Sequence, residues 1–309
     1  MAQSDRTPDD FDKPWKWVVE RFLKPFLQLC FPAVHDLVDW QHPAEFLDTE
    51  LQQLGPEHEQ GGRSVDRLVK VRLLDGREEW LFIHIEIQAQ PESQFPQRMW
   101  IYYYRIWDKY AQRVVSLAVL ADEDANWRPH AYQTETAGCR LLFEFPTFKV
   151  LDFQDAQAVF ERTRNPFALV IAAHQLALAT KRNPLQRYEG RFRLLRYLLS
   201  RGLDSGELRA LLKVTAMLTR LPKNLELQFK AEMATIPQMS IDELKTPLEE
   251  YLIEEGWQES VLQALELRFG ALPEDVRARV KQLTGEAELR RVHRLAITEP
   301  SLGQFLAKL

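Results

Sequence analysis

The sequence predicts an α/β core, a mixed sheet flanked by helices, followed by an all-α C-terminal half. Two patterns carry this prediction. From residue 64 to residue 74, and again from residue 79 to residue 88, apolar and polar side chains alternate with the period of two that β-strands have. After Asp155 the apolar residues recur with the helical period along the rest of the chain. We therefore expect the sheet in the first half of the chain and helices in the second.

Composition and charge exclude several classes of protein. The 309 residues are 45% apolar and 28% charged, as in an ordinary globular chain, and the net charge of −5 argues against indiscriminate coating of nucleic acid. Cys30 and Cys139 stand outside any metal-ligand spacing, and no two of the seven histidines are four residues apart, so zinc is not expected. The polar first residues and the short apolar runs predict a cytoplasmic protein without a membrane segment.

The first half of the chain predicts a helical stretch and then strands around an aromatic helix. Residues 13–31 are apolar at helical spacing, with Pro25 as the expected break, and residues 45–54 fit a strand or a helix. Asp75 and Gly76 mark a hairpin turn between the first two long strands. In chain order we expect strands at 64–74 and 79–88, a helix at 95–110, a strand at 114–120, and one or two strands at 139–153, interrupted by Pro146.

The second half predicts helices separated by prolines and glycines. Four helices are expected at residues 167–179, 187–201, 205–218 and 225–234. A small module follows, whose helix boundaries are marked by Gly270, Pro273, Thr284 and Ser301. The expected domains are a core at 1–155, a helical region at 156–250 and the helical module at 256–309. The module is a candidate surface for forming a homo-oligomer.

Three polar residues on the strand pair have the pattern of a metal-dependent phosphodiesterase. Hydrolysis of a phosphodiester uses a metal ion to activate water and to stabilise charge on the phosphorus oxygens. Mg²⁺ prefers oxygen ligands, so such a site offers carboxylates, and a further side chain orients the water. Asp66 and Glu86 lie on adjacent predicted strands. Gln88 and His84 share the face of Glu86 because each is two residues away from it.

Asp66 joins this face only if the hairpin register permits. With a two-residue turn Asp66 would face Ile85, whereas with a three-residue loop it would face Glu86. The metal-site hypothesis therefore predicts a loop of odd length, or one bulge, between the strands. An even register without a bulge would place the two acids on opposite faces and exclude the site.

An ordinary amphipathic hairpin with its polar face in water explains the same alternation. Many half-exposed strands carry acids, so the bare pattern is not specific. The context favours a site, because the second strand is strongly hydrophobic and ends in Glu-Ile-Gln. A helix rich in arginine and aromatic residues follows it.

Several longer segments of the first half carry a family resemblance. They are DFDKPWKWVVERFLKPF, EFLDTELQQL, VDRLVKVRLLDG, WLFIHIEIQAQ, FPQRMWIYYYRIWDKY, and VVSLAVLADED followed by GCRLLFEFP. In order and spacing, from Phe11 to Phe153, the chain resembles the Rpn-type recombination-promoting nucleases of the PD-(D/E)XK superfamily, bacterial proteins often labelled putative transposases. The stretch RFGALPEDVRARVKQLTGEAELRRV with SLGQFL resembles a small domain of unknown function that often closes such proteins.

The resemblance implies a restriction-endonuclease-like fold and a set of site residues. The family's metal acids fall on Asp66 and Glu86, which would hold Mg²⁺ or Mn²⁺. Its Glu-x-Gln ending falls on Gln88, where the wider superfamily has lysine. An amide can hydrogen-bond but does not bring the positive charge of a lysine. The superfamily's additional acid lies on an early helix, for which Asp12 and Glu50 are the candidates.

The resemblance also implies a function. It indicates a metal-dependent DNA endonuclease that hydrolyses phosphodiester bonds in recombination or transposition, with Asp66, Glu86 and Gln88 as catalytic residues and DNA as partner. The alternative is a catalytically weak or inactive nuclease-fold protein that acts as a nucleic-acid or protein-binding module.

Basic residues outside the strand pair are candidates for contact with nucleic acid. Arg98, Tyr102 and Arg105 recur on one stripe of the helix at 95–110, where they can hold phosphates or stack on a base. Alternatively, the aromatic residues of this helix pack on the sheet. Residues 181–201 carry seven positive side chains against one acid, which fits a nucleic-acid face or a solvated helix surface.

Overall fold

The computed structural model describes residues 11–48, 65–74, 80–233, 256–283 and 285–309. The chain forms two compact units. The first contains the sheet, the helices up to residue 203 and residues 214–229, and the second contains residues 204–213 and the chain from residue 230 onward. Only the backbone is described for Asp12, Lys13, Val65, Asp66, Lys223, Glu274, Gln282 and Glu286.

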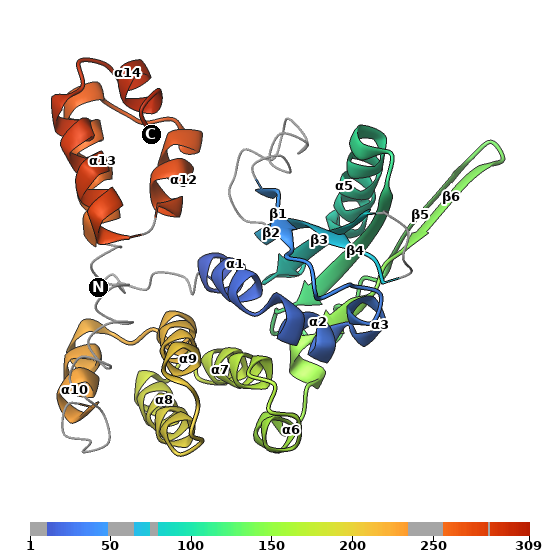
Figure 1. The fold of residues 1–309 in the computed structure, drawn as a ribbon, viewed down its shortest axis with the longest axis horizontal. Helices are drawn as coiled ribbons and strands as arrows, with labels where there is room; N and C mark the ends of the chain where they lie inside the picture. Colours follow the sequence, from blue (N-terminus) through green and yellow to red (C-terminus); the bar gives the residue numbers. More distant parts are fainter. Residues whose placement is uncertain (1–10, 49–64, 75–79, 234–255, 284) are drawn as a thin grey trace. The chain divides into compact units, whose positions relative to one another are not determined.

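A five-stranded mixed sheet forms the centre of the first unit, as the sequence predicts (Figure 1). Its strand order is β1-β2-β3-β4-β7; β2 runs antiparallel to β1 and β3, whereas β4 runs parallel to β3 and β7. Helix α5 (Phe95–Tyr110) carries the chain back between the parallel strands β3 and β4. The strands are β1 (Glu45–Phe46), β2 (Val65–Arg72), β3 (Trp80–Gln88), β4 (Arg113–Leu120) and β7 (Thr147–Lys149).

Helices cover both faces of this sheet (Figure 1). On one face, Tyr102 and Ile106 of α5 pack against Leu68 and Phe82 of the strands. The other face carries the buried isoleucines of β3 and lies against α1 (Asp12–Arg21), because Arg67 of β2 reaches the main chain of that helix. Beyond Trp80, β3 is therefore buried on both faces, so its polar residues as well as its isoleucines lie inside the protein.

The break in the first helical stretch falls at Phe22 rather than at Pro25. Phe22 has φ −126° and ψ 37°, outside the helical region, and separates α1 from α2 (Leu23–Cys30). Pro25 is the third residue of α2, in the first turn, where the N–H that proline lacks has no partner within the helix. The expected break exists but lies before the proline instead of at it.

Helix α7 (Phe167–Ala179) packs against α1 and α2 within the same unit. The ring of Phe167 lies 5.8 Å from that of Trp15 and 5.0 Å from that of Phe26, centroid to centroid. The indole N–H of Trp15 donates to Nδ1 of His174 at 3.3 Å, and Nε2 of His174 lies 2.8 Å from the carbonyl oxygen of Ala121. Since Nδ1 accepts and Nε2 donates, His174 is neutral, with its proton on Nε2.

The other helices follow the predicted order closely. They are α3 (Pro32–His35), α6 (Ala156–Thr163), α8 (Pro184–Leu199), α9 (Ser205–Leu218) and α10 (Lys223–Met233). Helices α5, α7 and α9 have the bounds that the sequence predicts, and α8 and α10 begin a few residues earlier than expected. Helix α6 was not predicted. Among the described residues, no helix combines the length and the apolar character needed to cross a bilayer.

Gly190 marks a close approach of α8 to α7. A Cβ atom at this position would lie 2.3 Å from Cδ1 and 3.2 Å from Cγ of Leu176. We expect Gly190→Ala to lower the free energy of unfolding by about 1–2 kcal/mol. The free-energy cost of overpacking against Leu176 should exceed the ~1 kcal/mol by which alanine is more favourable than glycine within a helix. Urea denaturation followed by circular dichroism measures the change.

Gly303 in α14 (Leu302–Leu306) provides the matched control, since nothing lies within 4 Å of an added Cβ there. Gly303→Ala should be neutral or stabilising. Adding Leu176→Ala to Gly190→Ala should remove the clash, so the two changes should be less than additive. A Gly190→Ala protein as stable as wild type would show that Leu176 moves aside without cost.

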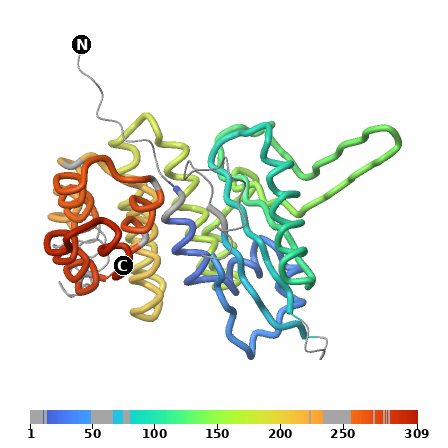
Figure 2. Tube along the Cα trace, turned by 90° about the horizontal axis from the view of Figure 1, so that it is seen from above, coloured from blue at the N-terminus to red at the C-terminus, as the bar shows by residue number. Residues whose placement is uncertain are grey.

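A two-stranded hairpin, here called the arm (residues 131–144), projects from the first unit (Figures 1 and 2). Strands β5 (Ala131–Thr136) and β6 (Cys139–Glu144) pair antiparallel and form a sheet of their own. Ala137 and Gly138 join them with φ values of +50° and +84°, which is the pattern of a type I′ turn. Strand β6 lies within the predicted strand region, whereas β5 was not predicted.

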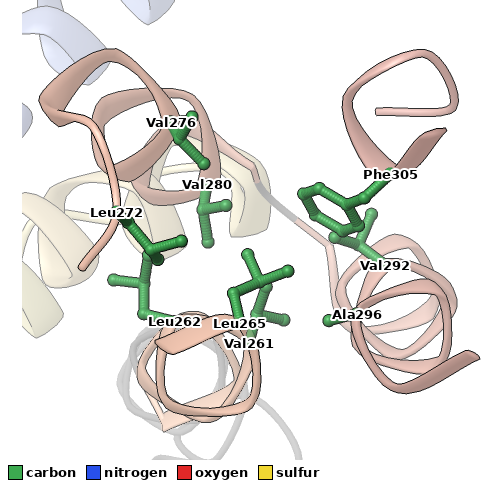
Figure 3. Close-up of a cluster of buried hydrophobic side chains, with 9 residues drawn as sticks. All are labelled: Val261, Leu262, Leu265, Leu272, Val276, Val280, Val292, Ala296 and Phe305. Carbon is green, nitrogen blue, oxygen red and sulfur yellow. The ribbon is translucent and has the colours of Figure 1, made fainter. Parts of the chain in front are cut away.

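The second unit ends in a helical module with its own core (Figure 3). Residues 256–269 are helical, and α12 (Glu274–Gln282), α13 (Glu286–Thr298) and α14 follow. The Oγ of Ser301 accepts a hydrogen bond from the backbone N–H of Gln304 at 3.3 Å, which confirms the predicted cap of the last helix. The buried side chains that meet between the helices are Val261, Leu262, Leu265, Leu272, Val276, Val280, Val292, Ala296 and Phe305.

Candidate functional site

The polar side chains of β3 lie on a buried face of the sheet. His84 and Glu86 expose none of their surface, and Gln88 exposes 7%. Helix α5 covers this face, and the ring of Tyr102 lies 5.1 Å from that of His84. A hairpin with its polar face in water is therefore excluded for β3. These side chains must instead find their partners inside the protein.

The register of β2 and β3 places Asp66 directly opposite Glu86. The antiparallel pairing continues without a bulge along the full length of β2, from Val65 opposite Ile87 to Arg72 opposite Trp80. Directly opposed residues share one face of an antiparallel pair, so positions 66 and 86 occupy the same face. The strands are joined by residues 73–79, an odd number, of which 75–79 lie outside the described residues. The register that the metal-site hypothesis required is confirmed.

The side chains of three of the predicted acids lie outside the described part of the structure. The backbone of Asp66 is placed in β2 and that of Asp12 at the start of α1, but the side chains of both lie outside the description. Glu50 lies outside the described residues altogether. The geometry of the site is therefore built from Glu86, Gln88 and the groups around them.

Arg98 of α5 bonds to the end of β3. Its Nη2 donates to Oε1 of Gln88 at 2.8 Å, and its Nη1 donates to Oε2 of Glu92 at 2.7 Å. The Nε atom of Arg98 lies 3.7 Å from Oε1 of Glu86. In turn, Nε2 of Gln88 donates to the carbonyl of Gln90 at 2.7 Å. The side chain of Arg98, which is 9% exposed, thus stands beside both the amide and the carboxylate.

His84 links the site to the neighbouring strand β4. Its Nδ1 lies 3.2 Å from Oγ of Ser116, and its Nε2 lies 3.5 Å from Oε1 of Glu86. The tautomer with its proton on Nε2 directs that N–H to the carboxylate and lets Nδ1 accept from the serine hydroxyl. The carboxylate of Glu86 therefore lies between the imidazole of His84 and the guanidinium of Arg98.

A second charged cluster lies on the opposite face and ties β2 to α1. Arg67 donates to the carbonyl of Lys16 at 2.6 Å and to Oε2 of Glu20 at 2.9 Å, and it also pairs with Asp48. Burial raises the pKa of Asp48, although the charge of Arg67 and a hydrogen bond from the N–H of Leu68 act to lower it. Because it lies on the other face, this cluster supports the sheet and does not join Glu86.

The residues proposed for nucleic-acid contact on α5 differ in exposure. Arg98 and Tyr102 are buried against the sheet, whereas Arg105 is half-buried. Packing of the aromatic residues on the sheet, the alternative drawn from the sequence, holds for Tyr102. Contact of these three residues with phosphate stays a prediction.

Two arginines of the basic stretch at 181–201 bond to other groups within the helical region. Arg187 donates to the carbonyl of Ala177 at 3.0 Å, and Arg191 forms a forked pair with Glu226 at 2.7 and 3.1 Å. Both arginines are buried. The charge that this stretch presents to solvent is therefore smaller than the sequence alone indicates.

A buried ion pair lies at the ends of β4 and β7, and the sequence reasoning did not single it out. Nζ of Lys149 lies 2.7 Å from both carboxylate oxygens of Asp122 and 2.7 Å from the carbonyl of Asp124. The two charged side chains are 3% and 1% exposed. The signal in the sequence was an acid just after one buried strand and a lysine at the end of another. The pair fixes the loop that leads into the arm.

The described side chains do not by themselves form a metal centre. Among them, which exclude Asp66, there is no group of three or more His, Cys, Asp or Glu residues that could hold a metal ion. No protein-family model, curated protein or solved structure matches this chain. The chemistry of the site therefore rests on its own geometry.

Proposed function

We propose that the protein is a metal-dependent DNA endonuclease of the PD-(D/E)XK type, with Asp66, Glu86 and Gln88 as catalytic residues. The observation that carries this proposal is the register that sets the two acids opposite each other on one face of the sheet. The mixed sheet flanked by helices agrees with the fold that the family resemblance implies. DNA as the substrate, and a role in recombination, follow from the same resemblance.

The donor set fits Mg²⁺ or Mn²⁺. Both acids offer hard oxygen ligands, and directly opposed residues have Cβ atoms about 4.5–5.5 Å apart, close enough for two carboxylates to share one cation. A cation would add to the positive charge that Arg98, 3.7 Å away, already brings to the fully buried carboxylate of Glu86. Asp66 and Glu86 would hold the ion, which when bound would activate water and neutralise charge at the scissile phosphate.

Gln88 is placed to orient the attacking water. Its carbonyl oxygen has two lone pairs and accepts a hydrogen bond from Arg98, so a water can donate to the second. Arg98 brings to this end of β3 the positive charge that an amide lacks. Arg98 therefore acts as a positioning residue, since its guanidinium fixes the amide of Gln88 and lies beside Glu86.

Incubation of the purified chain with single-stranded and duplex DNA tests the proposal. Cleavage is expected with Mg²⁺ or Mn²⁺ and not with EDTA, and Asp66→Asn should abolish it. Calorimetric titration with Mn²⁺ should give a heat of binding that is absent in Asp66→Asn. Absence of cleavage under all of these conditions, or equal cleavage by Asp66→Asn, would exclude the enzyme.

A nuclease-fold protein without turnover, which binds nucleic acid or a protein partner, is the second candidate. In its favour, both ends of the Gln88 amide already bond to groups of the protein. These hydrogen bonds form within the protein and require neither a water nor a metal ion. Binding of Mn²⁺ separates the two candidates, because a degenerate scaffold should show no binding that depends on Asp66.

Arg98→Met is expected to slow cleavage about 10–100-fold, as is usual for residues that orient the ligands of a metal site. The change removes both the positive charge and the hydrogen bond to Gln88. Adding Gln88→Lys should restore part of the rate, because the lysine returns the charge to the same end of β3. Plasmid cleavage by the two single variants and the double variant measures this, with circular dichroism as the check on folding. If the double variant is no faster than Arg98→Met, charge is not what Arg98 contributes.

A further inference from the structure

The arm presents two outer edges along which no strand of the described chain pairs. Every residue from 133 to 140 is exposed. Only the base of the arm packs on the rest of the unit, where the ring of Phe143 lies 4.8 Å from that of Tyr103 in α5. A two-stranded ribbon is marginally stable by itself, and its unpaired edges are templates for further strands.

The turn determines which residues of β6 offer their backbone groups to a new strand. In a hairpin with a two-residue turn, the residues that flank the turn exchange hydrogen bonds, and these are Thr136 and Cys139. Bonding then alternates along the ladder, so every second residue of β6 directs its N–H and C=O away from β5. The outward residues are Arg140, Leu142 and Glu144.

We propose that a second copy of this chain pairs its β6 antiparallel with this edge, giving a four-stranded sheet with a two-fold axis at Leu142. In this register Leu142 opposes Leu142 of the partner subunit, and Arg140 opposes Glu144 of the partner subunit. All three outward residues are used, two opposite-charge pairs form, and a leucine that is 56% exposed is covered. A two-fold interface uses the same surface on both copies, which this strand satisfies.

The distribution of charged residues favours β6 over β5 as the pairing edge, and a second copy of the chain as the partner. Strand β5 carries a single charged residue, Glu135, so pairing of β5 with itself creates no opposite-charge pair. Strand β6 carries one charge of each sign, two positions on either side of Leu142, which makes an antiparallel copy of itself complementary. Within its own arm Arg140 pairs with Glu135 at 3.2 Å, whereas Glu144 opposes the uncharged Ala131. The second copy supplies the cation that Glu144 lacks across the hairpin.

Glu144→Arg is the sharpest single change. Because position 144 opposes Ala131 within the arm, the change leaves the hairpin's own charge pairs intact, but it sets like charges opposite each other twice in the dimer. Sedimentation equilibrium should show a dimer for wild type and a dissociation constant at least about tenfold higher for Glu144→Arg. Arg140→Glu should weaken the dimer likewise. An equimolar mixture of the two variants should regain dimers, because every pair in the heterodimer is again of opposite charge.

A disulfide at the two-fold axis tests the register. Directly opposed residues of a hydrogen-bonded antiparallel pair have Cα atoms about 5.5 Å apart, within the range that a disulfide spans. Leu142→Cys in a Cys139→Ser background should therefore form a cross-linked dimer on oxidation. Gln133→Cys in the same background is the matched control, since Gln133 is the neighbour of Leu142 on the far strand of the arm and should give no cross-link.

Two results would overturn this inference. A wild-type chain that remains a monomer has no such interface. The edge of β6 would then either stay unpaired or pair with a strand of another protein. A dimer that persists in Glu144→Arg and does not cross-link through position 142 has its interface elsewhere, the C-terminal module included. Neither result depends on DNA cleavage, so the arm and the candidate nuclease site are tested separately.

Discussion

Glu86→Gln is expected to reduce the rate of metal-dependent DNA cleavage by more than about 100-fold. Substituting a residue that only orients a metal ligand usually lowers activity about 10–100-fold, and loss of a ligand itself should lower it further. The substitution keeps the size of the side chain and an acceptor oxygen near Arg98 and His84, and it removes the negative charge. Rates of plasmid cleavage in Mg²⁺ measure the effect, and Mn²⁺ titration should show weakened binding.

The matched control is Glu45→Gln on β1 of the same sheet. Its side chain is 57% exposed and pairs with Lys70 at 3.1 Å on the edge strand, four residues along β2 from Asp66, so cleavage should equal that of wild type. Urea denaturation of Glu86→Gln checks that lost cleavage is not lost folding, since the change also removes an anion 3.7 Å from the buried Arg98. Cleavage by Glu86→Gln at the wild-type rate would remove Glu86 from the proposed metal site.

Lys149→Met is expected to cause a large loss of stability, about 3–5 kcal/mol, because it leaves the carboxylate of Asp122 buried without its cation. Lys149 also donates to the carbonyl of Asp124, so the loop before the arm loses a second contact. Urea denaturation at neutral pH measures the loss. Adding Asp122→Asn should recover part of it, because the uncompensated charge is then gone.

Lys181→Met provides the control for removing a cation from an ion pair at the surface. Lys181 pairs with Glu123 at 3.2 Å, next to Asp122 in the chain, but the two side chains are 52% and 60% exposed. Solvent screens such pairs, and the expected loss is below about 1 kcal/mol. Equal losses for Lys149→Met and Lys181→Met would show that burial does not strengthen the inner pair.

Local sequence patterns predict elements whose apolar run is long or whose periodicity is clear. Helix α7 was predicted with its observed bounds because a long apolar run begins directly after Pro166 and ends before the polar residues at 180–182. Strand β5, with the sequence AYQTET, escaped prediction because it has few apolar residues, and helix α6 because it is only eight residues long. Strand β5 forms by pairing with the adjacent strand β6 across a two-residue turn, and α6 forms with the burial of Phe160.

For the candidate site, the sequence by itself determined which residues of β3 share a face, because the strand period of two is local. It also showed that Asp66 could share a face with Glu86 only if the loop between the strands had an odd number of residues or one bulge. The observed pairing meets this condition. Only the tertiary structure decided that this face is buried and that Arg98, rather than solvent, meets Gln88 and Glu86. The physical reason is that burial and long-range partners depend on how α5 lies across the sheet, which no local pattern of residues specifies.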